Sequence, residues 1–436
     1  AALGAKTDKL DKRVTKLEKG IGSWQISGRF KFDVTMTGGD NDAGSAWTKE
    51  RGKYEFTKDV ARLFFRRQIT EDTYFDSQFR VGSDWAGSIK TVDKISPKGK
   101  QEKIDADGRG DTHAFSMRKF YVGTKLPFWG LQLKIGRTQF DWEGMYDLYD
   151  TNALMGDWRY DGFWFTKKWS KVQFDGVIGR NQSGAPRSYV AEGFGNGKNF
   201  LYAANLKWTP TDKITLGAMG YWQQGDGAEA SASGKSIDNM QTYGLTAGYK
   251  FTDGIALKGI YYWQKLSNGT TLDGIKIEDS QYAWKAILDV KQSVLKFTDL
   301  WVEYSQMKNA FGGDNGAGDD NYCYSLGGKS GEPSVYWVRP INNEVTKTWY
   351  IRAEQKWNKK WSTFLRFTFA DFGTDGVDNA KEWGLGVKYK LNPAITFMLA
   401  YDSLDYGDNV YSGTTCHGGS QHGKDNVIFF QTDVKF

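Results

Sequence analysis

Apolar and polar residues alternate along most of the chain. The first clear case is WQISGRFKFDVTM, which begins at Trp24. One face of this stretch is apolar apart from a glycine, and the other face is polar or charged throughout. Because successive side chains of a strand point to opposite sides, this period of two predicts strands with an apolar and a polar face. The pattern recurs to the end of the chain, and we count about 18 segments, with 16 as the alternative if one hairpin belongs to a loop.

The connections between these segments alternate between short and long. TEDT, PFWG, TPTD, TDG, NKK and NPA are short and carry turn residues. Long polar connections cover 38–58, 86–111, 181–198 and 308–344. Tight turns at one end, long loops at the other and an even strand count are typical of outer-membrane barrels. The sequence therefore predicts an all-β transmembrane antiparallel β-barrel over 23–436, located in the outer membrane.

The last segment, VIFFQTDVKF, ends the printed sequence at Phe436. It alternates like the others, and an unpaired strand at this place would template aggregation. We expect it to pair with the strand that starts at Trp24, which closes the cylinder and pairs every backbone group within the bilayer. Its apolar face, with Phe436, would then contact lipid, the first expected partner of the chain.

Composition supports this class. Of 436 residues, 16% are aromatic and 25% are charged, and the mean hydropathy is −0.60. No run approaches the ~18–20 apolar residues of a membrane helix. The net charge of +6 comes from both signs spread along the chain, which argues against a nucleic-acid partner. A soluble β-rich lectin or glycan hydrolase, which would use aromatic side chains for stacking, is the alternative at the level of the fold.

Residues 1–22 have a different period. Four apolar residues recur at alternating steps of four and three, namely Leu10, Val14, Leu17 and Ile21. This seam predicts the end of a short coiled-coil stalk and hence an oligomer. A lone amphipathic helix or a frayed tail is the alternative, because helices of this length are marginal by themselves.

The inward faces of the first strands are rich in bases. Assigning the apolar positions to lipid leaves five bases on the inward face, and Arg137, where a strand meets a loop, is added to them. The six predicted wall residues are Arg29, Lys31, Arg62, Arg66, Arg80 and Arg137. Neighbouring strands supply them, so they predict one cationic wall, tempered by inward Asp33, Asp76 and Asp84. A generally solvated lining with weak Arg–Asp pairs is the alternative interpretation.

The connection at about 138–160 is both acidic and aromatic. Its carboxylates are Asp141, Glu143, Asp147, Asp150 and Asp157. Its aromatic and aliphatic residues give it apolar surface with which to pack, so we expect it to fold into the barrel and narrow the channel. Acids that face the basic wall would create a transverse field that favours small hydrophilic solutes and ions.

The stretch LQLKIGRTQFDWEGMYD followed by DWRYDGFWFTKKW resembles the fifth strand, inward-folded third loop and sixth strand of Gram-negative general porins. The resemblance implies a pore constriction in which Asp141, Glu143 and Asp147 face a basic ladder. Arg137 matches the arginine of that family at the loop entrance, and Tyr146 and Asp147 match a Pro-x-Tyr-Asp pattern that lacks its proline here. The terminal aromatic strand resembles the insertion signal of outer-membrane barrels.

A coiled coil that runs directly into a porin barrel resembles the OmpM-type tethered porins of diderm Firmicutes. That resemblance implies a homotrimer, and a cell-wall polymer as a partner through an N-terminal domain that this sequence lacks. It would make the chain a link between outer membrane and wall as well as a channel.

Other chemistry is weakly indicated. Cys323 and Cys416 lie in long loops and predict a disulfide, with two free thiols as the alternative. CHGGSQHGKD matches no strong zinc pattern, so we expect a flexible glycine loop and no metal site. DGVDNAKE and GGDNGAGDDN favour at most loosely bound calcium, and no other cofactor is indicated. The three histidines, His113, His417 and His422, lie outside the strands, which argues against an enzyme.

The sequence thus favours an outer-membrane porin for passive diffusion of small hydrophilic solutes and ions through a charged constriction. Two alternatives remain open. One is a substrate-specific porin, which a count of about 18 strands also suits. The other is a structural tether or adhesin that uses the barrel only as an anchor.

Overall fold

A computed structural model describes most of the barrel region. The described residues are 24–39, 54–84, 91–95, 101–105, 114–150, 153–155, 158–181, 199–224, 239–266, 271–272, 275–311, 323–325, 336–338, 342–407 and 423–436. The predicted stalk at 1–22 lies outside them. Asp157 and Cys416 of the predicted disulfide also lie outside them, so the stalk, the role of Asp157 and the disulfide stay predictions.

Eighteen strands form one antiparallel sheet. They are β1 (Trp24–Gly39), β2 (Tyr54–Gln68), β3 (Thr73–Asp84), β6 (Ala114–Lys125), β7 (Gln132–Phe140), β8 (Trp158–Lys168), β9 (Val172–Asn181), β10 (Asn199–Thr211), β11 (Ile214–Gln224), β12 (Asn239–Thr252), β13 (Ile255–Leu266), β16 (Ser280–Val290), β17 (Asp299–Lys308), β20 (Val345–Lys356), β21 (Trp361–Asp371), β22 (Ala380–Lys390), β23 (Ile395–Gly407) and β24 (Gly423–Lys435).

Small elements accompany this sheet. Three two-stranded pieces pair β4 (Thr91–Ile95) with β5 (Gln101–Asp105), β14 (Thr271–Leu272) with β15 (Ile275–Lys276), and β18 (Cys323–Ser325) with β19 (Tyr336–Val338). Two short helices are described, α2 (Trp142–Met145) and α4 (Gln292–Leu295). Among the described residues, no helix has the length and apolar composition needed to cross a membrane.

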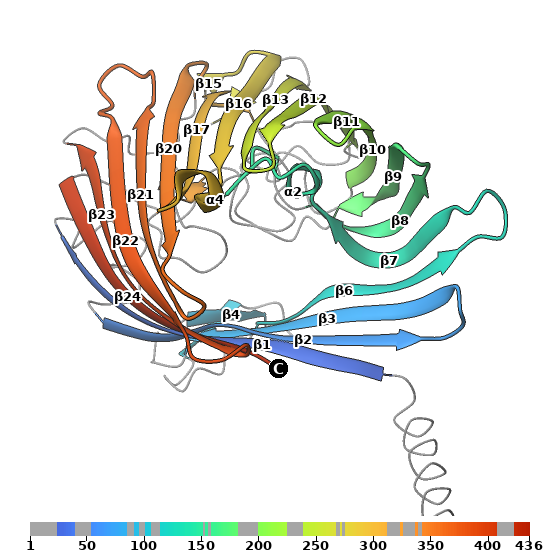
Figure 1. The fold of residues 1–436 in the computed structure, drawn as a ribbon, viewed down its shortest axis with the longest axis horizontal. Coiled ribbons are helices and arrows are strands. Elements are labelled where there is room, and N and C mark those ends of the chain that lie inside the picture. The colour runs from blue at the N-terminus through green and yellow to red at the C-terminus, as the bar shows by residue number, and fades with distance from the viewer. Residues whose placement is uncertain are drawn as a thin grey trace, which may run out of the picture.

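The sheet closes on itself. Each barrel strand pairs with its neighbour in the sequence, and β1 pairs with β24 from Arg29 opposite Lys435 to Gly39 opposite Asp425. The strands therefore form a continuous ring when seen end-on (Figure 1). The predicted antiparallel barrel of 18 strands is confirmed, and closure leaves no unpaired edge between the first and last strands.

The barrel buries polar residues and exposes apolar ones. Lys285 and Arg366, on inward positions of β16 and β21, are each 1% exposed, whereas Leu245, on an outward position of β12, is 54% exposed. In a soluble protein this distribution would be reversed. It is the distribution of a barrel whose outer face contacts hydrocarbon and whose interior is polar.

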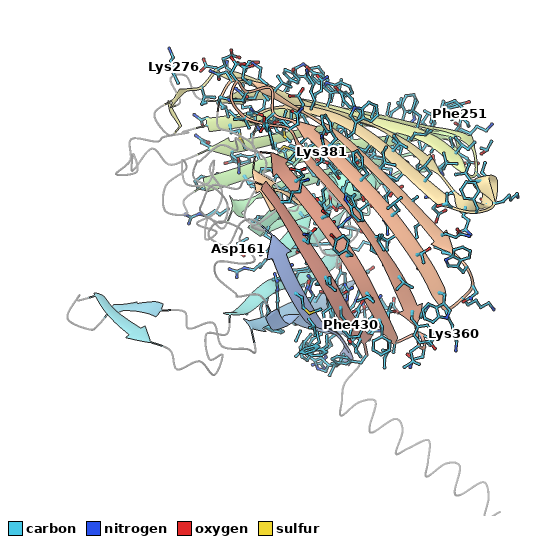
Figure 2. All side chains as sticks on the ribbon, turned by 90° about the vertical axis from the view of Figure 1, so that its left-hand side faces the viewer. Asp161, Phe251, Lys276, Lys360, Lys381 and Phe430 are labelled. Carbon is cyan, nitrogen blue, oxygen red and sulfur yellow. The ribbon has the colours of Figure 1, made fainter. Side chains whose placement is uncertain are left out.

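Exposed aromatic side chains gather where the short turns lie. They are Trp24, Trp129, Trp169, Trp208, Tyr249, Trp357 and Trp361. Such a girdle marks a membrane interface. Figure 2 separates the two ends of the barrel: Phe251 and Lys360 lie at the end with short turns, and Lys276 lies at the opposite end with the long loops.

The last residue completes the closing ladder. The Phe436 amide donates to the Gly28 carbonyl at 3.0 Å, and the Gly28 amide donates to the Phe436 carbonyl at 2.6 Å. The Phe436 ring covers Gly28, where an added Cβ would lie 2.3 Å from the ring carbon Cζ. Gly28 thus makes room for the terminal aromatic ring, and Phe436 remains exposed on the outer face as expected.

Candidate functional site: the loop inside the barrel

The connection between β7 and β8 enters the barrel. Its helix α2 lies inside the ring of strands, close to β11–β13, with β1–β3 on the opposite side (Figure 1). Asp141 begins this helix as its N-cap and accepts a hydrogen bond from the Gly144 amide at 2.8 Å. The inward fold that the acidic and aromatic sequence of this loop predicted is therefore present.

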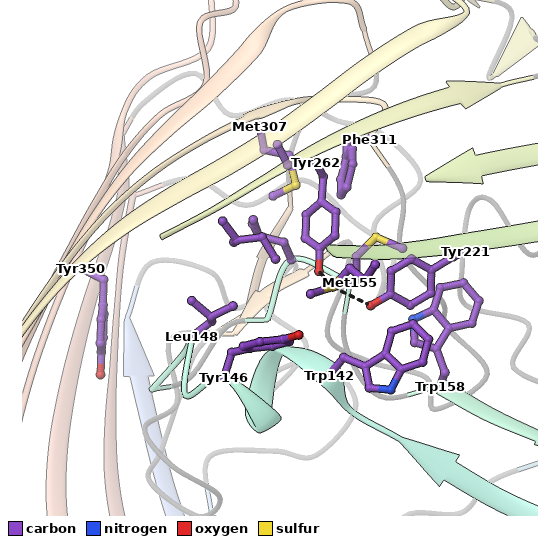
Figure 3. Close-up of a cluster of buried hydrophobic side chains, with 14 of the residues drawn as sticks. Trp142, Tyr146, Leu148, Met155, Trp158, Tyr221, Tyr262, Met307, Phe311 and Tyr350 are labelled. Carbon is purple, nitrogen blue, oxygen red and sulfur yellow. Dashed lines mark hydrogen bonds between the residues drawn. The ribbon is translucent and has the colours of Figure 1, made fainter. Parts of the chain in front are cut away.

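Aromatic and aliphatic side chains fix the loop to one wall. Trp142, Leu148, Leu154, Met155 and Trp158 are buried against wall residues Tyr221, Tyr262 and Phe311 (Figure 3). The ring centroids of Trp142 and Trp158 each lie 5.1 Å from that of Tyr221. Aromatic packing of this extent needs a defined geometry, so the loop is held as a rigid part of the wall.

Glu143 is the polar centre of this contact. Its carboxylate accepts hydrogen bonds from the Leu154 amide at 2.8 Å and the Met155 amide at 2.6 Å. The Tyr262 hydroxyl donates to it at 3.1 Å. One side chain therefore joins the first turn of the loop to its returning part and to β13.

Tyr146 and Met145 dock on the neighbouring strands. The Tyr146 hydroxyl donates to Asn205 Oδ1 at 2.8 Å, and Lys207 Nζ donates to the Met145 carbonyl at 2.8 Å. A Cβ added at Gly217 would lie 2.3 Å from the Tyr146 hydroxyl. Tyr146 therefore fits against β11 only because position 217 has no side chain.

Two further acids of the loop reach the C-terminal half of the wall. Asp147 contacts Lys258 Nζ, which also binds Asp289 at 3.0 Å. Asp150 accepts a hydrogen bond from the Tyr350 hydroxyl at 2.7 Å and from Arg352 at 3.4 Å. The loop is thus attached to β10, β13 and β20, which extends its anchorage along a large part of the wall.

These contacts change the expected role of two acids. Glu143 is 1% exposed and Asp150 is 3% exposed. Their carboxylates hold the loop in place, so the expectation of acids exposed at a constriction does not hold for them. Asp141 caps α2 and also accepts from the Tyr149 hydroxyl. Asp147 is the most exposed of the four described acids.

The predicted bases of β1–β3 lie in register. Arg29 is opposite Arg62 on β2 and Lys435 on β24, and Arg62 is opposite Arg80 on β3. The four positions form one row across four adjacent strands, which we call the cation row. Asp433 offsets part of the positive charge of this row. Its carboxylate binds Arg29 Nε and a terminal nitrogen of the same side chain, each at 2.7 Å.

The two other predicted wall residues on these strands, Lys31 and Arg66, lie beside the cation row. Lys31 is buried on β1, at a position opposite Asp433. Arg66 is opposite Asp76, and its guanidinium carbon lies 4.3 Å from the centroid of the Tyr74 ring. Both positions belong to the inward face.

Arg137 does not belong to this wall. It is opposite Phe120 and two residues after Ile135, both of which are exposed on the outer face. Its guanidinium binds Asp161 on β8 through Nε at 2.8 Å. The period of two places Arg137 with Ile135 on the outside, so its expected place among the inward bases is wrong.

A second inward charged cluster was not expected from the sequence. Arg366 on β21 binds Glu382 at 3.3 Å and Asp402 at 3.1 Å, and all three side chains are buried. On a neighbouring part of the wall, Lys285 binds Glu303 at 2.8 Å. The same alternation that revealed the first bases runs through β16–β23 and would have found these residues.

Burial of Glu143 makes the stability of the docked loop depend on pH. It raises the pKa of this carboxyl, although Lys285 and the two backbone amides act in the opposite direction. A raised folded pKa stabilises the docked loop fully below the unfolded value of about 4.3, and this stabilisation is lost as the pH rises through the folded pKa. We expect the Leu154 and Met155 amides to lose hydrogen-exchange protection as the pH rises.

The control for this pH dependence is Glu143→Gln, which has no titrating group at this position and should show protection that does not change with pH. Constant protection in the unaltered protein, after correction for the intrinsic exchange rates, would contradict the expectation.

Fold and interior together define a class. A closed barrel with an apolar outer face, an aromatic girdle and a polar interior is a transmembrane barrel of the outer membrane, as the sequence predicted. Solved structures show the same fold. Acinetobacter baumannii OccAB3 is 10% identical with a TM-score of 0.54, covering 95% of this chain and 99% of that one. OccAB4 of the same organism is 13% identical with a TM-score of 0.54, covering 95% and 98%.

The outer membrane protein OprD from Pseudomonas aeruginosa is 12% identical with a TM-score of 0.52, covering 95% of this chain and 93% of that one. At these identities the similarity establishes the fold, a closed β-barrel. No family model matches the sequence, and no curated protein matches it.

Proposed function

We propose that this protein is an outer-membrane channel through which small hydrophilic solutes and ions diffuse passively. The observation that supports this most is the arrangement of the barrel interior. The cation row of β1–β3 and β24 faces inward, and the loop that enters the barrel is fixed to the wall at β10–β13 and β20. A rigid loop and a charged wall would give a passage of constant shape with a fixed field.

The field of this passage should favour anions. Two of the loop acids are buried in contacts with the wall, and Asp147 is paired with Lys258. The cation row has four basic members, and Asp433, which binds Arg29, lies beside it. Fixed charges inside a low-dielectric wall act on passing ions more strongly than surface charges do. Small anionic solutes are therefore the proposed preferred cargo.

Removal of two cations should change ion preference. In Arg62→Gln combined with Arg80→Gln, we expect the anion-to-cation permeability ratio in planar bilayers to fall about fivefold or more per charge. One charge ~4 Å from an ion in water contributes about 1 kcal/mol, favourable for an anion and unfavourable for a cation. The measurement is the reversal potential in a salt gradient. Arg67→Gln is the matched control, because Arg67 lies on the outward face of the same strand. An unchanged ratio in the double variant would remove the cation row from the conduction path.

A substrate-specific channel is the second candidate, and the extensive anchoring of the loop favours it, because a rigid constriction can select by shape. Flux that saturates with one class of small anion and is inhibited by its analogues would favour this form. Flux that rises linearly for all small polar solutes would favour general diffusion. Absence of conductance would leave an anchor as the function of the barrel.

The homotrimer, the OmpM-type tether and the cell-wall partner remain proposals. They are supported by the apolar seam of 1–22 in the sequence alone. The mass of the detergent-extracted particle tests the trimer, and sedimentation with purified cell wall tests the tether.

A further inference from the structure

The outer wall of the barrel carries an apolar groove at β8–β11. Its volume is about 770 Å³. Large side chains surround it, among them Trp129, Phe165, Phe174, Tyr202 and Trp222. Cavities of this size hold molecules with the bulk of a small ligand. The groove lies outside the barrel and has no part in the passage proposed above.

The floor of the groove is made by small residues in register. Gly176 on β9 is opposite Ala204 on β10, and both line the groove. They lie on the outward face, as do Ile178 and Tyr202, their exposed neighbours two positions along. Two adjacent strands thus present no large side chain at the same level, which hollows the wall there. On β11, the Trp222 ring covers Gly220, the residue opposite Ala204, and borders the hollow.

Two lysines flank the short-turn end of this groove. Lys167 lines it and donates a hydrogen bond to the Trp129 carbonyl, and its ammonium lies 5.9 Å from the Trp169 ring centroid. Lys171 is exposed in the adjacent turn and donates to the Pro210 carbonyl at 2.7 Å. An ammonium group has three N–H donors, so one carbonyl leaves donors for an anion.

We propose that the groove binds one phospholipid with an anionic headgroup, with an acyl chain on the floor made by Gly176 and Ala204 and the phosphate between Lys167 and Lys171. The outer face contacts hydrocarbon, so an occupant must be apolar. Apolar contact alone does not favour one lipid over another at this groove, because lipid tails are as apolar as the wall. Fit to the hollow and attraction to lysines at the interface supply the selectivity.

A second copy of this chain is the rival occupant. Two copies related by a twofold axis would bring the lysines of each groove toward those of the other, which is unfavourable. The phosphate of a lipid complements the same charges. The position of the lysines at the aromatic girdle, where headgroups lie, favours the lipid.

The test measures lipid retained on the purified protein. The full chain is reconstituted in vesicles of phosphatidylglycerol and phosphatidylcholine and extracted in mild detergent. Native mass spectrometry then measures the mass of the protein with its bound lipid. We expect phosphatidylglycerol to be retained in preference to phosphatidylcholine, at one molecule per barrel. Lys167→Gln and Lys171→Gln should each lower this retention about fivefold, the equivalent of ~1 kcal/mol per lysine.

Filling the groove should remove the lipid. Ala204→Trp places a large side chain on the floor and should reduce retention of either lipid about tenfold or more. Gly176→Leu is the second variant for the case in which Ala204→Trp does not insert, since a Cβ at position 176 meets nothing closer than the Phe174 ring at 3.4 Å. Lys360→Gln is the matched control. Lys360 is exposed between Trp357 and Trp361 in another short turn, and Leu365 protrudes on the adjoining wall.

Each result decides the proposal. Loss of phosphatidylglycerol in the groove and lysine variants but not in Lys360→Gln supports it. Equal retention in all variants overturns it, and equal retention of both lipids overturns the role of the lysines. A change in oligomer mass without loss of lipid would make the groove a contact between copies of the chain. Conductance should be unchanged in all variants. A negative result for lipid binding would therefore leave the proposed channel function untouched, and a negative result for conduction would leave the lipid site untouched.

Discussion

Glu143→Ala is expected to release the loop from the barrel wall. The substitution leaves the Leu154 and Met155 amides buried without their acceptor. It also removes one acceptor of the Tyr262 hydroxyl, which keeps its contact with the Met219 sulfur at 3.2 Å. A buried donor that loses its partner costs about 1–3 kcal/mol. Two such amides put the expected loss in docking free energy at about 2–6 kcal/mol. The loop should then exchange its amides rapidly and fluctuate within the passage.

Hydrogen exchange of the loop and single-channel recording measure this effect. We expect loss of protection at 142–155 and conductance that switches among several levels. Asp147→Ala is the control on the same loop. The side chain of Asp147 is more than half exposed, so its ion pair with Lys258 contributes little, about 0–1 kcal/mol.

A second variant, on strand β11 of the wall, should disturb the same loop. Gly217→Ala places a Cβ 2.3 Å from the Tyr146 hydroxyl, so Tyr146 must move. It should reproduce part of the Glu143→Ala behaviour while the Glu143 contacts remain available. Full protection of the loop in Glu143→Ala would show that its other contacts are sufficient to hold it, and would contradict the anchoring role of this carboxylate.

The barrel could be predicted because its physical signal is local. Each strand must place apolar residues toward hydrocarbon at every second position, and each short turn needs residues that bend the chain. Both requirements appear within about ten residues of sequence, so a single chain displays them. Closure by the last strand followed from the cost of an unpaired edge, and the Gly28–Phe436 ladder agrees with it.

The roles of the loop acids could not be predicted in the same way. Glu143 is bound by Tyr262, and Asp150 by Tyr350, so each partner lies more than a hundred residues away. The local sequence shows only that the loop is acidic and aromatic. Which acids are buried depends on wall side chains that alternation orients but does not pair with particular loop residues.

Arg137 shows the opposite case, in which local information was sufficient. Ile135 and Arg137 share one face of β7, so the exposed Ile135 places Arg137 outside. The expectation rested on the place of Arg137 where a strand meets a loop, and the period of two was not applied to it. The cation row of Arg29, Arg62 and Arg80 followed the period and lies in register.

Arg366→Leu is expected to destabilise the barrel itself. Arg366 is the cation between Glu382 and Asp402, at 3.3 and 3.1 Å, and all three side chains are buried. Without it, two carboxylates of like charge remain close together on adjacent strands away from water. Removal of one partner from a buried ion pair costs about 3–5 kcal/mol, because the remaining charge is not compensated. We expect a markedly lower midpoint of thermal unfolding in detergent, followed by circular dichroism of the strands.

The decisive comparison is with a variant that removes all three charges. Arg366→Leu combined with Glu382→Gln and Asp402→Asn removes all three charges of this cluster, so most of the lost stability should return. Arg67→Leu, on the outward face of β2, controls for loss of an arginine as such. If the single variant unfolds at the same temperature as the unaltered protein, the two acids do not depend on Arg366. If the triple variant is less stable than the single one, the cluster contributes net stability. The attraction among its charges then exceeds the cost of removing them from water.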